Sequence, residues 1–246
     1  MIKFENLTKI FHGVPAVDNI NLYVPPGNVF GFIGPNGAGK TTTIKMMVGV
    51  LRPTNGNIFI NGMDLSKEST QIKRIIGFIP DRPFLYEKLS GNEFLKFKAG
   101  LYGMLPNSVD KKISELLTIF ELTDWADELI ESYSHGMKQR LIIASAIMHD
   151  PKVIIVDEPM VGLDPNGAKL VKEIFLNRTR KGDTVFMSTH TLSLAQEICG
   201  LIAIVDKGRI LACGSYEDLK RQTRTEGNLE SIFLRLTKGD KNSESI

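Results

Sequence analysis

The chain has 246 residues, of which 42% are hydrophobic and 24% are charged, and its formal net charge is +2. This composition excludes an intrinsically disordered chain, and the small charge argues against a nucleic-acid partner, whose binding face is strongly basic. Two cysteines without metal-ligand spacing favour a reducing, cytoplasmic setting. No apolar run approaches the ~18 residues of a membrane span, so we expect any membrane role to depend on a partner.

The chain reads mainly as β-structure up to residue 79. Alternating or continuous apolar runs predict strands at residues 2–11, 16–24, 28–34, 57–62 and 75–79. The first two runs meet at the turn-forming His12–Gly13, which predicts a hairpin. The third run leads into a glycine-rich loop, and a helix is predicted from about Lys40 through residue 51 to the breakers Pro53 and Gly56.

The middle of the chain is predicted to be helical. Ser90 and Glu93 have the spacing of a capping box, and residues 109–120 carry apolar positions at helical spacing. Residues 137–149 are apolar over most of the helix circumference, which predicts a buried helix that stops at Asp150–Pro151.

The last part of the chain returns to strands. They are predicted at residues 152–159, at residues 183–190 and in a hairpin over residues 201–214 that turns at Lys207–Gly208. Strands that alternate with helices predict an α/β fold with a mostly parallel sheet, into which the helical block 84–149 is inserted as a subdomain.

The glycine-rich stretch GPNGAGKT at residues 34–41 fits G-x-x-x-x-G-K-[ST] between a strand and a helix, which is the context of a P-loop. Its glycines allow backbone N–H groups to turn toward phosphate oxygens at a helix N-terminus. Lys40 is predicted to reach the β- and γ-phosphates, and Thr41 to offer a hydroxyl to Mg²⁺. A chance match in a chain of this composition has odds of about one per cent, so we predict nucleotide binding by Gly34, Pro35, Asn36, Gly37, Ala38, Gly39, Lys40, Thr41 and Thr42.

Two further stretches indicate phosphate chemistry. VIIVDE at residues 153–158 places Asp157 and Glu158 at the end of an apolar strand, where Asp157 is predicted to hold Mg²⁺ and Glu158 to polarise a water for attack on the γ-phosphate. Alone, such a pair is more often a solvated strand end, but a P-loop on the same sheet favours the catalytic interpretation.

YSHGMKQR at residues 133–140 places Ser134 and Gly136 at the start of a buried helix, which predicts a second anion site. A head-to-tail dimer would use both sites, because one helix end would cover the partner's γ-phosphate.

Five motifs occur in the order and spacing of the ATP-binding cassette (ABC) ATPases: GPNGAGKT, YSHGM followed by KQR, VIIVDEP, VGLDP and STH. On these motifs the chain resembles that family over residues 1–220. The resemblance implies a P-loop NTPase with a RecA-like core, an N-terminal antiparallel β subdomain and an inserted α-helical subdomain. It implies an ABC ATPase domain at residues 1–225, followed by a short C-terminal helix and a polar tail at residues 226–246.

The resemblance also implies roles for single residues. Asp157 and Glu158 correspond to the Mg²⁺-side and catalytic carboxylates, and Asp164 to the loop that crosses the dimer interface. His190 corresponds to the histidine that contacts the γ-phosphate and orients Glu158. Phe11 stands where the family places an aromatic ring under the adenine, although a phenylalanine is a core residue by default.

The signature stretch is one departure from the family pattern. The family's usual form is L-S-G-G-Q, whereas this chain has Tyr133, His135 and Met137 at the first, third and fifth positions and retains Ser134 and Gly136. A histidine in place of glycine limits backbone freedom, although histidine tolerates positive φ better than most residues. We expect ATP recognition to survive and the strength of the dimer to differ.

The second departure lies in IGFIPDRPFLY, residues 76–86. Where the family has a Gln whose amide oxygen meets Mg²⁺ and the attacking water, this chain has Asp81. A carboxylate is also a good Mg²⁺ ligand, but it is shorter by a methylene and adds negative charge, which Arg82 would offset. Our hypothesis is that Asp81 is a metal ligand that replaces the Gln, and that Pro80 and Pro83 stiffen the link to a partner. The alternative is an ordinary surface turn.

The resemblance implies the cytoplasmic ATPase subunit of an ABC transporter, peripheral on the inner face of the membrane through separate membrane-spanning permease subunits. We expect ATP and Mg²⁺ to be bound, a second cassette to dimerise with this one as homodimer or heterodimer, and no nucleic acid to be bound. The loop with Phe84, Leu85 and Tyr86 is the predicted docking surface. The form of the signature resembles bacterial exporters of drugs, antibiotics or peptides.

The competing hypothesis is a non-transport ABC ATPase that acts on ribosomes or nucleic acid. Ribosome-acting members of the family usually carry two cassettes in one chain, and DNA-repair members insert long coiled coils, whereas this chain has one cassette and no sustained heptads. A kinase or GTPase switch does not explain YSHGM or STH.

Overall fold

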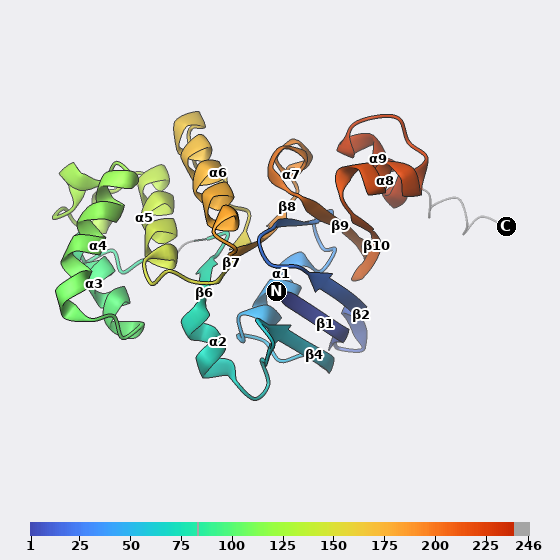
Figure 1. Cartoon of the computed structure of the whole chain (residues 1–246), viewed down its shortest axis with the longest axis horizontal. Helices are drawn as coiled ribbons and strands as arrows, with labels where there is room; N and C mark the ends of the chain where they lie inside the picture. Colours follow the sequence, from blue (N-terminus) through green and yellow to red (C-terminus); the bar gives the residue numbers. More distant parts are fainter. Residues whose placement is uncertain (83, 239–246) are drawn as a thin grey trace.

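The computed structural model describes residues 1–82 and 84–238, which form two sheets flanked by helices (Figure 1). A six-stranded sheet has the order β10-β9-β3-β8-β7-β6, and a four-stranded sheet has the order β2-β1-β4-β5. The pairs β3–β8, β3–β9, β6–β7 and β7–β8 are parallel, and β10 is antiparallel to β9. The paired strands of the smaller sheet are all antiparallel. The predicted α/β class and the N-terminal antiparallel sheet are therefore confirmed.

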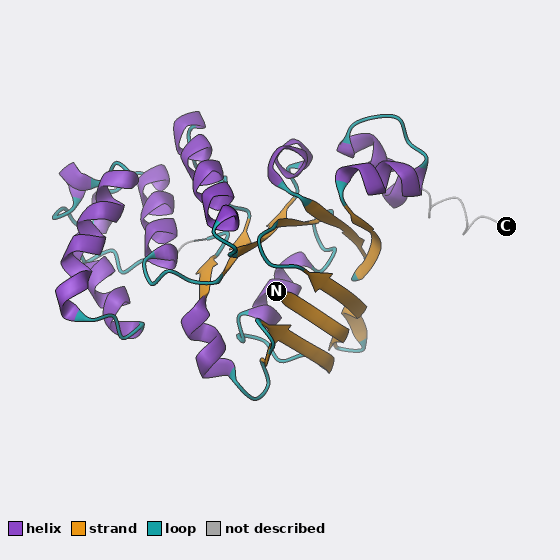
Figure 2. Cartoon of the chain, in the orientation of Figure 1, coloured by secondary structure: helices purple, strands orange, loops and turns teal. Residues whose placement is uncertain are grey.

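Strands and helices alternate through most of the described chain (Figure 2). The strands are β1 (Ile2–Phe11), β2 (Val14–Val24), β3 (Val29–Ile33), β4 (Asn55–Ile60), β5 (Met63–Asp64), β6 (Ile76–Ile79), β7 (Val153–Asp157), β8 (Thr184–Thr189), β9 (Leu201–Asp206) and β10 (Arg209–Gly214). The helices are α1 (Lys40–Met47), α2 (Ser69–Ile75), α3 (Gly91–Leu101), α4 (Pro106–Ile119), α5 (His135–Ile147), α6 (Pro165–Arg180), α7 (Leu192–Ile198), α8 (Tyr216–Thr223) and α9 (Leu229–Lys238).

The strands of the parallel sheet are apolar because both faces of the sheet are covered. Every residue of β3, β7 and β8 is buried. Phe186 on β8 packs against Phe30 and Phe32 of β3, with ring centroids 5.5 Å and 5.4 Å apart. Since β6, β7, β8 and β3 are neighbours and parallel, the segments that follow their carboxyl ends meet at one edge of the sheet.

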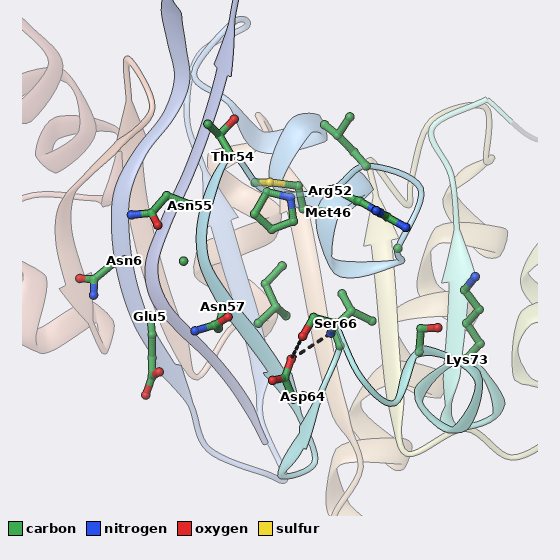
Figure 3. A pocket seen from close by; sticks show the side chains of 17 residues that line it. Glu5, Asn6, Met46, Arg52, Thr54, Asn55, Asn57, Asp64, Ser66 and Lys73 are labelled. Carbon is green, nitrogen blue, oxygen red and sulfur yellow. Dashed lines mark hydrogen bonds between the residues drawn. The ribbon is translucent and has the colours of Figure 1, made fainter.

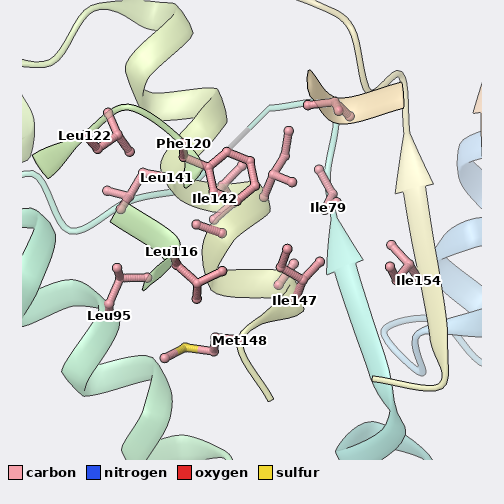
Figure 4. Close-up of a cluster of buried hydrophobic side chains, with 14 of the residues drawn as sticks. Ile79, Leu95, Leu116, Phe120, Leu122, Leu141, Ile142, Ile147, Met148 and Ile154 are labelled. Atoms are coloured by element: carbon pink, nitrogen blue, oxygen red, sulfur yellow. The ribbon is translucent and has the colours of Figure 1, made fainter. Parts of the chain in front are cut away.

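The helices α3, α4 and α5 lie beside the β6 edge of this sheet and share a hydrophobic cluster with it (Figures 1 and 4). Phe120, Leu141 and Leu116 pack in this cluster with Ile79 of β6 and Ile154 of β7. Burial of these side chains removes apolar area from water at about 25 cal/mol per Å². The predicted buried helix at 137–149 is confirmed, because eight residues of α5 are buried.

His149 shows how this helical region is joined to the sheet. Its ring stacks on Tyr102, with centroids 3.6 Å apart, and its Nε2 lies 3.0 Å from the carbonyl oxygen of Ile76 in β6. Burial lowers the pKa of His149 to about 4, so the ring is neutral near pH 7. This histidine therefore has a structural role.

Local sequence signals were reliable at the turns and at one helix start. The capping box is present, since Ser90 Oγ accepts from the Glu93 amide and the Glu93 carboxylate accepts from the Ser90 amide. The hairpin turns lie at His12–Gly13 and Lys207–Gly208, where all four residues have positive φ.

Two local predictions were wrong. The helix after the P-loop ends at Met47 instead of continuing to residue 51, because Gly49 adopts φ +74 and the amides of Val50 and Leu51 both donate to the Lys45 carbonyl. Residues 57–79 contain the helix α2 as well as strands, and its single buried residue, Ile72, left too weak a periodicity to detect.

A stability prediction follows from the ion pairs of Arg178, near the end of α6. Its side chain is 13% exposed and lies 2.9 Å from Asp183, which is 5% exposed, and 3.0 Å from Asp150. We expect Arg178→Met to lower the free energy of unfolding by about 3 kcal/mol, because Asp183 would keep a buried charge without its closest cation. Urea unfolding measures the change.

The matched control for this prediction is Arg180→Met on the same helix. Within the described residues, the Arg180 guanidinium donates only to the exposed side-chain amide of Asn177. This control should change the stability by less than about 0.5 kcal/mol. Adding Asp183→Asn to Arg178→Met should recover part of the loss. Equal stability of Arg178→Met and the unaltered chain would contradict the proposed weight of this pair.

Candidate functional site

The predicted catalytic and phosphate-binding residues meet at the carboxyl edge of the parallel sheet. The P-loop follows β3, Asp157 ends β7 with Glu158 directly after it, and His190 follows β8. Because β8 lies between β3 and β7, these segments are neighbours in space although they are far apart in sequence.

The P-loop wraps the N-terminus of α1. Gly39 is the residue before the helix and has φ +98, and a Cβ at this position would overlap the carbonyl oxygen of Ala16. Only glycine fits both the left-handed backbone and the close approach. The tight turn leaves the first N–H groups of α1 free for an anion.

Lys40 is held inside the P-loop. Its side-chain amine donates to the carbonyl oxygens of Gly34 at 2.7 Å and Pro35 at 3.1 Å, and the residue is 7% exposed. Burial lowers the pKa of Lys40, and the charges of Glu158 and Asp157 oppose this shift. The Lys40 ammonium group therefore lies inside the loop, where phosphate oxygens would replace the carbonyl oxygens of Gly34 and Pro35 as its hydrogen-bond acceptors.

Asp157 is positioned by two hydroxyl groups. Thr41 Oγ1 donates to its Oδ2 at 3.0 Å, and Ser188 Oγ donates to its Oδ1. The carboxylate is 4% exposed, and the register of the sheet pairs Asp157 with Ser188. The STH motif by itself gives Ser188 no role; the parallel register of β7 and β8 is the signal that identifies it as a partner of Asp157.

The oxygens of Thr41 and Asp157 fit the preference of Mg²⁺ for one or two protein ligands beside phosphate and water. Residues 1–82 and 84–238 contain no group of three or more His, Cys, Asp or Glu side chains able to enclose a metal. A hydroxyl and a carboxylate 3.0 Å apart at a P-loop therefore suit a metal that arrives with a nucleotide.

Glu158 accepts three hydrogen bonds from Thr189, the last residue of β8, and from His190, the residue that follows it. Thr189 Oγ1 donates to Oε2 at 3.0 Å, the His190 amide donates to Oε1 at 3.0 Å, and His190 Nδ1 lies 2.7 Å from Oε1. Glu158 itself has φ +52, an unusual conformation for a non-glycine residue that clusters at functional sites. The sequence pattern alone did not predict this contact of Thr189 with the Glu158 carboxylate.

The signature residues lie at the start of α5. Ser134 is its N-cap, with Oγ accepting from the Met137 amide at 3.2 Å, and His135 is the first helical residue. Among the described residues, no hydrogen bond joins Ser134 or Gly136 to the P-loop of the same chain. The backbone freedom of a glycine is not required at His135, because its φ is not positive.

Tyr133 explains one departure from the family pattern. This residue is 4% exposed, and its hydroxyl donates to the carbonyl of Trp125 at 2.6 Å. A Cβ at Gly91 would overlap that hydroxyl. Tyr133 thus anchors the loop before α5 to the start of α3.

Phe11 and Asp81 lie at the surface. Phe11 ends β1 and is 42% exposed, with the Lys9 amine 5.2 Å from its ring centroid, so it is not a core residue. Asp81 is exposed in the bend that follows β6. No hydrogen bond or ion pair within the described residues fixes its carboxylate. Pro83, the second proline of the hypothesis, lies outside the described residues.

A separate hollow of about 870 Å³ lies near the opposite end of α1 (Figure 3). Its lining includes Met46, Thr54, Asp64 and Lys73, and none of the predicted site residues. Eight residues of α1 span about 12 Å, which separates this hollow from the P-loop.

The family described as "ABC transporter" matches residues 17–161, more than half of the chain. The chain belongs to the ABC transporter family. It is the cassette that binds and hydrolyses ATP, and the P-loop, Asp157 and Glu158 lie together on its sheet as that chemistry requires. No helix in the described part of the cassette is long and apolar enough to cross a membrane.

Curated relatives cover most of this cassette. It is 39% identical to the uncharacterized ABC transporter ATP-binding protein YhcH of Bacillus subtilis, and the matched region covers 89% of the cassette and 71% of YhcH. It is 37% identical to the bacitracin transport ATP-binding protein BcrA of Bacillus licheniformis, and the matched region covers 91% of the cassette and 72% of BcrA. It is 36% identical to the daunorubicin/doxorubicin resistance ATP-binding protein DrrA of Streptomyces peucetius, and the matched region covers 99% of the cassette and 72% of DrrA.

Solved structures agree with this assignment. An ATP-binding subunit of an ABC transporter has a TM-score of 0.91 and 32% identity, covering 96% of the cassette and 99% of that chain. A dimeric ATP-binding cassette in a post-hydrolysis state with ADP and Pi has a TM-score of 0.79 and 25% identity, covering 87% of the cassette and 98% of that chain.

Proposed function

We propose that the cassette powers an exporter by closing on ATP as one half of a cassette dimer and by passing the motion to separate permease subunits. The observation that carries this proposal is that one chain holds an assembled P-loop and carboxylate site and a second anion-binding helix terminus at Ser134 and Gly136. Within the described residues no hydrogen bond joins this second terminus to the P-loop of the same chain, so a partner cassette, identical or different, would supply the terminus that covers the bound phosphates.

In this proposal each residue has a distinct task at the γ-phosphate. Lys40 and the P-loop amides hold the phosphates. Glu158 aligns and polarises the attacking water, and His190 and Thr189 fix the direction of its carboxylate. Mg²⁺, held by Thr41 and Asp157, would neutralise developing charge on the phosphate oxygens when bound. Phe11 offers its exposed face to the adenine ring.

The surface next to Asp81 suits a membrane partner. Phe84 is 77% exposed and meets Tyr86 edge-on, with centroids 5.8 Å apart, and Tyr86 meets Phe97 edge-on at 5.3 Å. Leu101, one helical turn after Phe97, is also exposed. Leu85 is buried and anchors the loop from below. A row of exposed aromatic side chains is typical of an interaction surface, and docking there would place the cassette on the cytoplasmic face of the membrane.

The direction of transport, export, is proposed from the names of two relatives. BcrA is named for bacitracin transport and DrrA for daunorubicin and doxorubicin resistance. We further propose the division expected from the sequence, with the ATPase domain at residues 1–225, its helical subdomain at 84–149, and the C-terminal part at 226–246. In its support, α3, α4 and α5 fall within the second range and α9 within the last.

The test of this function is isolation of the full chain with its partners. The cassette should co-purify with an apolar, multi-span protein encoded in the neighbouring reading frame, and that complex in vesicles should hydrolyse ATP and export a test drug. A chain found only on ribosomes, with no membrane partner, would favour the non-transport alternative and contradict the proposal.

Asp81 receives its own prediction. If its carboxylate performs the work of the usual Gln, Asp81→Ala should lower permease-coupled ATPase activity about tenfold, the lower range for residues that orient a metal site, while Asp81→Gln should retain most of it. ATPase rates with and without the permease measure the effect. Wild-type activity and coupling in both variants would show that the segment is an ordinary surface turn.

A further inference from the structure

The ring of His135 touches the segment that carries the catalytic carboxylate. A Cβ built at Gly162 would overlap the Cδ2 and Nε2 atoms of His135, so the imidazole occupies the space of a side chain at position 162. On the same turn of α5, a Cβ at Gly136 would lie 3.1 Å from the Gly162 carbonyl oxygen. The start of α5 is therefore in direct contact with this loop.

The touched loop is short and held at both ends. At one end the Glu158 amide donates to the Ser188 carbonyl at 3.0 Å. At the other end Asp164 caps α6, its side chain accepting from the Gly167 amide at 3.0 Å. Only Pro159, Met160 and Val161 separate Glu158 from Gly162. A displacement of Gly162 must therefore be absorbed close to the carboxylate.

The contact depends on both residue types. Gly162 has φ +80, and an L-residue there would be strained as well as obstructed. His135 has helical geometry, in which a smaller side chain would be tolerated by the backbone and would leave Gly162 uncovered. A glycine at position 135, the usual residue in the family signature, could not make this contact.

We propose that His135 is a positioning residue for Glu158: its ring braces Gly162, so that the helix terminus at Ser134 and Gly136 and the catalytic carboxylate of the same chain move together. The inference rests on the proposed function, in which that terminus meets the partner's ATP. The brace would link two sites of the dimer: the partner's ATP, which the terminus at Ser134 and Gly136 contacts, and the attacking water, which Glu158 of the same chain holds at its own site.

The brace is distinguishable from a contribution to folding, because His135 and Gly162 are both exposed and an exposed contact adds little to global stability. The first test is His135→Ala in the full chain. We expect kcat for ATP to fall about tenfold through misplacement of Glu158, while KM for ATP and the thermal midpoint stay within error. His135→Phe, which keeps a flat ring, should retain most of the activity.

The second test is a double-variant cycle. Gly162→Ala should lower kcat by more than His135→Ala, because the new methyl group displaces the ring and strains the backbone. His135→Gly combined with Gly162→Ala should be at least threefold more active than Gly162→Ala alone, a gain equal to about 0.65 kcal/mol in activation free energy. Ser132→Ala is the matched control and should behave as wild type, because in the described part of the chain the Ser132 hydroxyl donates only to the Leu129 carbonyl.

Hydrogen exchange provides a readout that needs no activity. The amides of Val161 and Leu163 donate within the loop, to Glu158 and Met160 at 3.4 Å and 3.2 Å. In His135→Ala they should exchange at least fivefold faster than in the wild-type chain, while amides of β7 remain unchanged. Unchanged exchange in His135→Ala, or strictly additive effects of His135→Gly and Gly162→Ala on kcat, would overturn the brace. A wild-type chain that hydrolyses no ATP with its partners would instead overturn the proposed function, and the exchange result would still decide the brace.

Discussion

Glu158→Gln is expected to lower the rate of ATP hydrolysis by about 10²–10⁴-fold and to leave ATP binding in place. The amide has the shape of the carboxylate and can still accept from His190, and the Thr189 hydroxyl can rotate to accept from the new amino group. The change removes the negative charge that polarises the attacking water. It leaves the P-loop contacts of Lys40 untouched.

Phosphate release at saturating ATP measures the rate, and titration calorimetry measures the affinity. The matched control is Glu173→Gln, the same substitution at an exposed position of α6, which should hydrolyse ATP as wild type does. A Glu158→Gln variant that kept more than about half of the wild-type rate would exclude the proposed role of Glu158 and leave the water to another group.

Lys40→Met is expected to weaken ATP binding about a hundredfold, the scale for removing one partner of a buried charged contact. The wild-type amine lies 2.7 Å from the Gly34 carbonyl at the position where phosphate oxygens would arrive. Methionine fills a similar volume, so we expect the fold to persist. Without the cation, the charges of Asp157 and Glu158 would oppose the triphosphate without compensation.

Calorimetric affinity for ATP tests this second prediction, together with thermal unfolding to establish that the variant is folded. Lys45→Met is the matched control, because Lys45 lies on the same helix and is exposed. It should bind ATP with the wild-type affinity. An unchanged affinity in Lys40→Met would mean that the backbone amides alone hold the phosphates.

Most of the local structure could be predicted because it depends on neighbours in sequence. The alternation of the first two strands, the capping box at Ser90 and the pattern around Lys40 are all properties of short windows. The end of α1 differs from the prediction for a local reason, since Gly49 adopts a positive φ and ends the helix before the breakers Pro53 and Gly56. Helix α2 was missed because it buries only Ile72 and so shows no apolar stripe.

Part of the site was less predictable, because its contacts join strands that are distant in sequence. Asp157 and Glu158 were predicted as a pair, but the hydroxyl partners that hold them, Ser188 and Thr189, come from β8. Their role follows from the register of two parallel strands, and no short window of sequence contains that register. His190 was found only by resemblance, and its 2.7 Å contact with Glu158 supplies the physical basis.

By itself, the sequence determined the family, the α/β class and the residues of the P-loop, since each of these is encoded in residue types at fixed spacing along the chain. The tertiary structure decided that Phe11 lies at the surface, that Tyr133 has a buried hydroxyl partner and that His135 meets Gly162. These facts depend on the packing of α3, α5 and the sheet against one another. Packing is set by the shapes of many side chains at once and not by the residues next to each position.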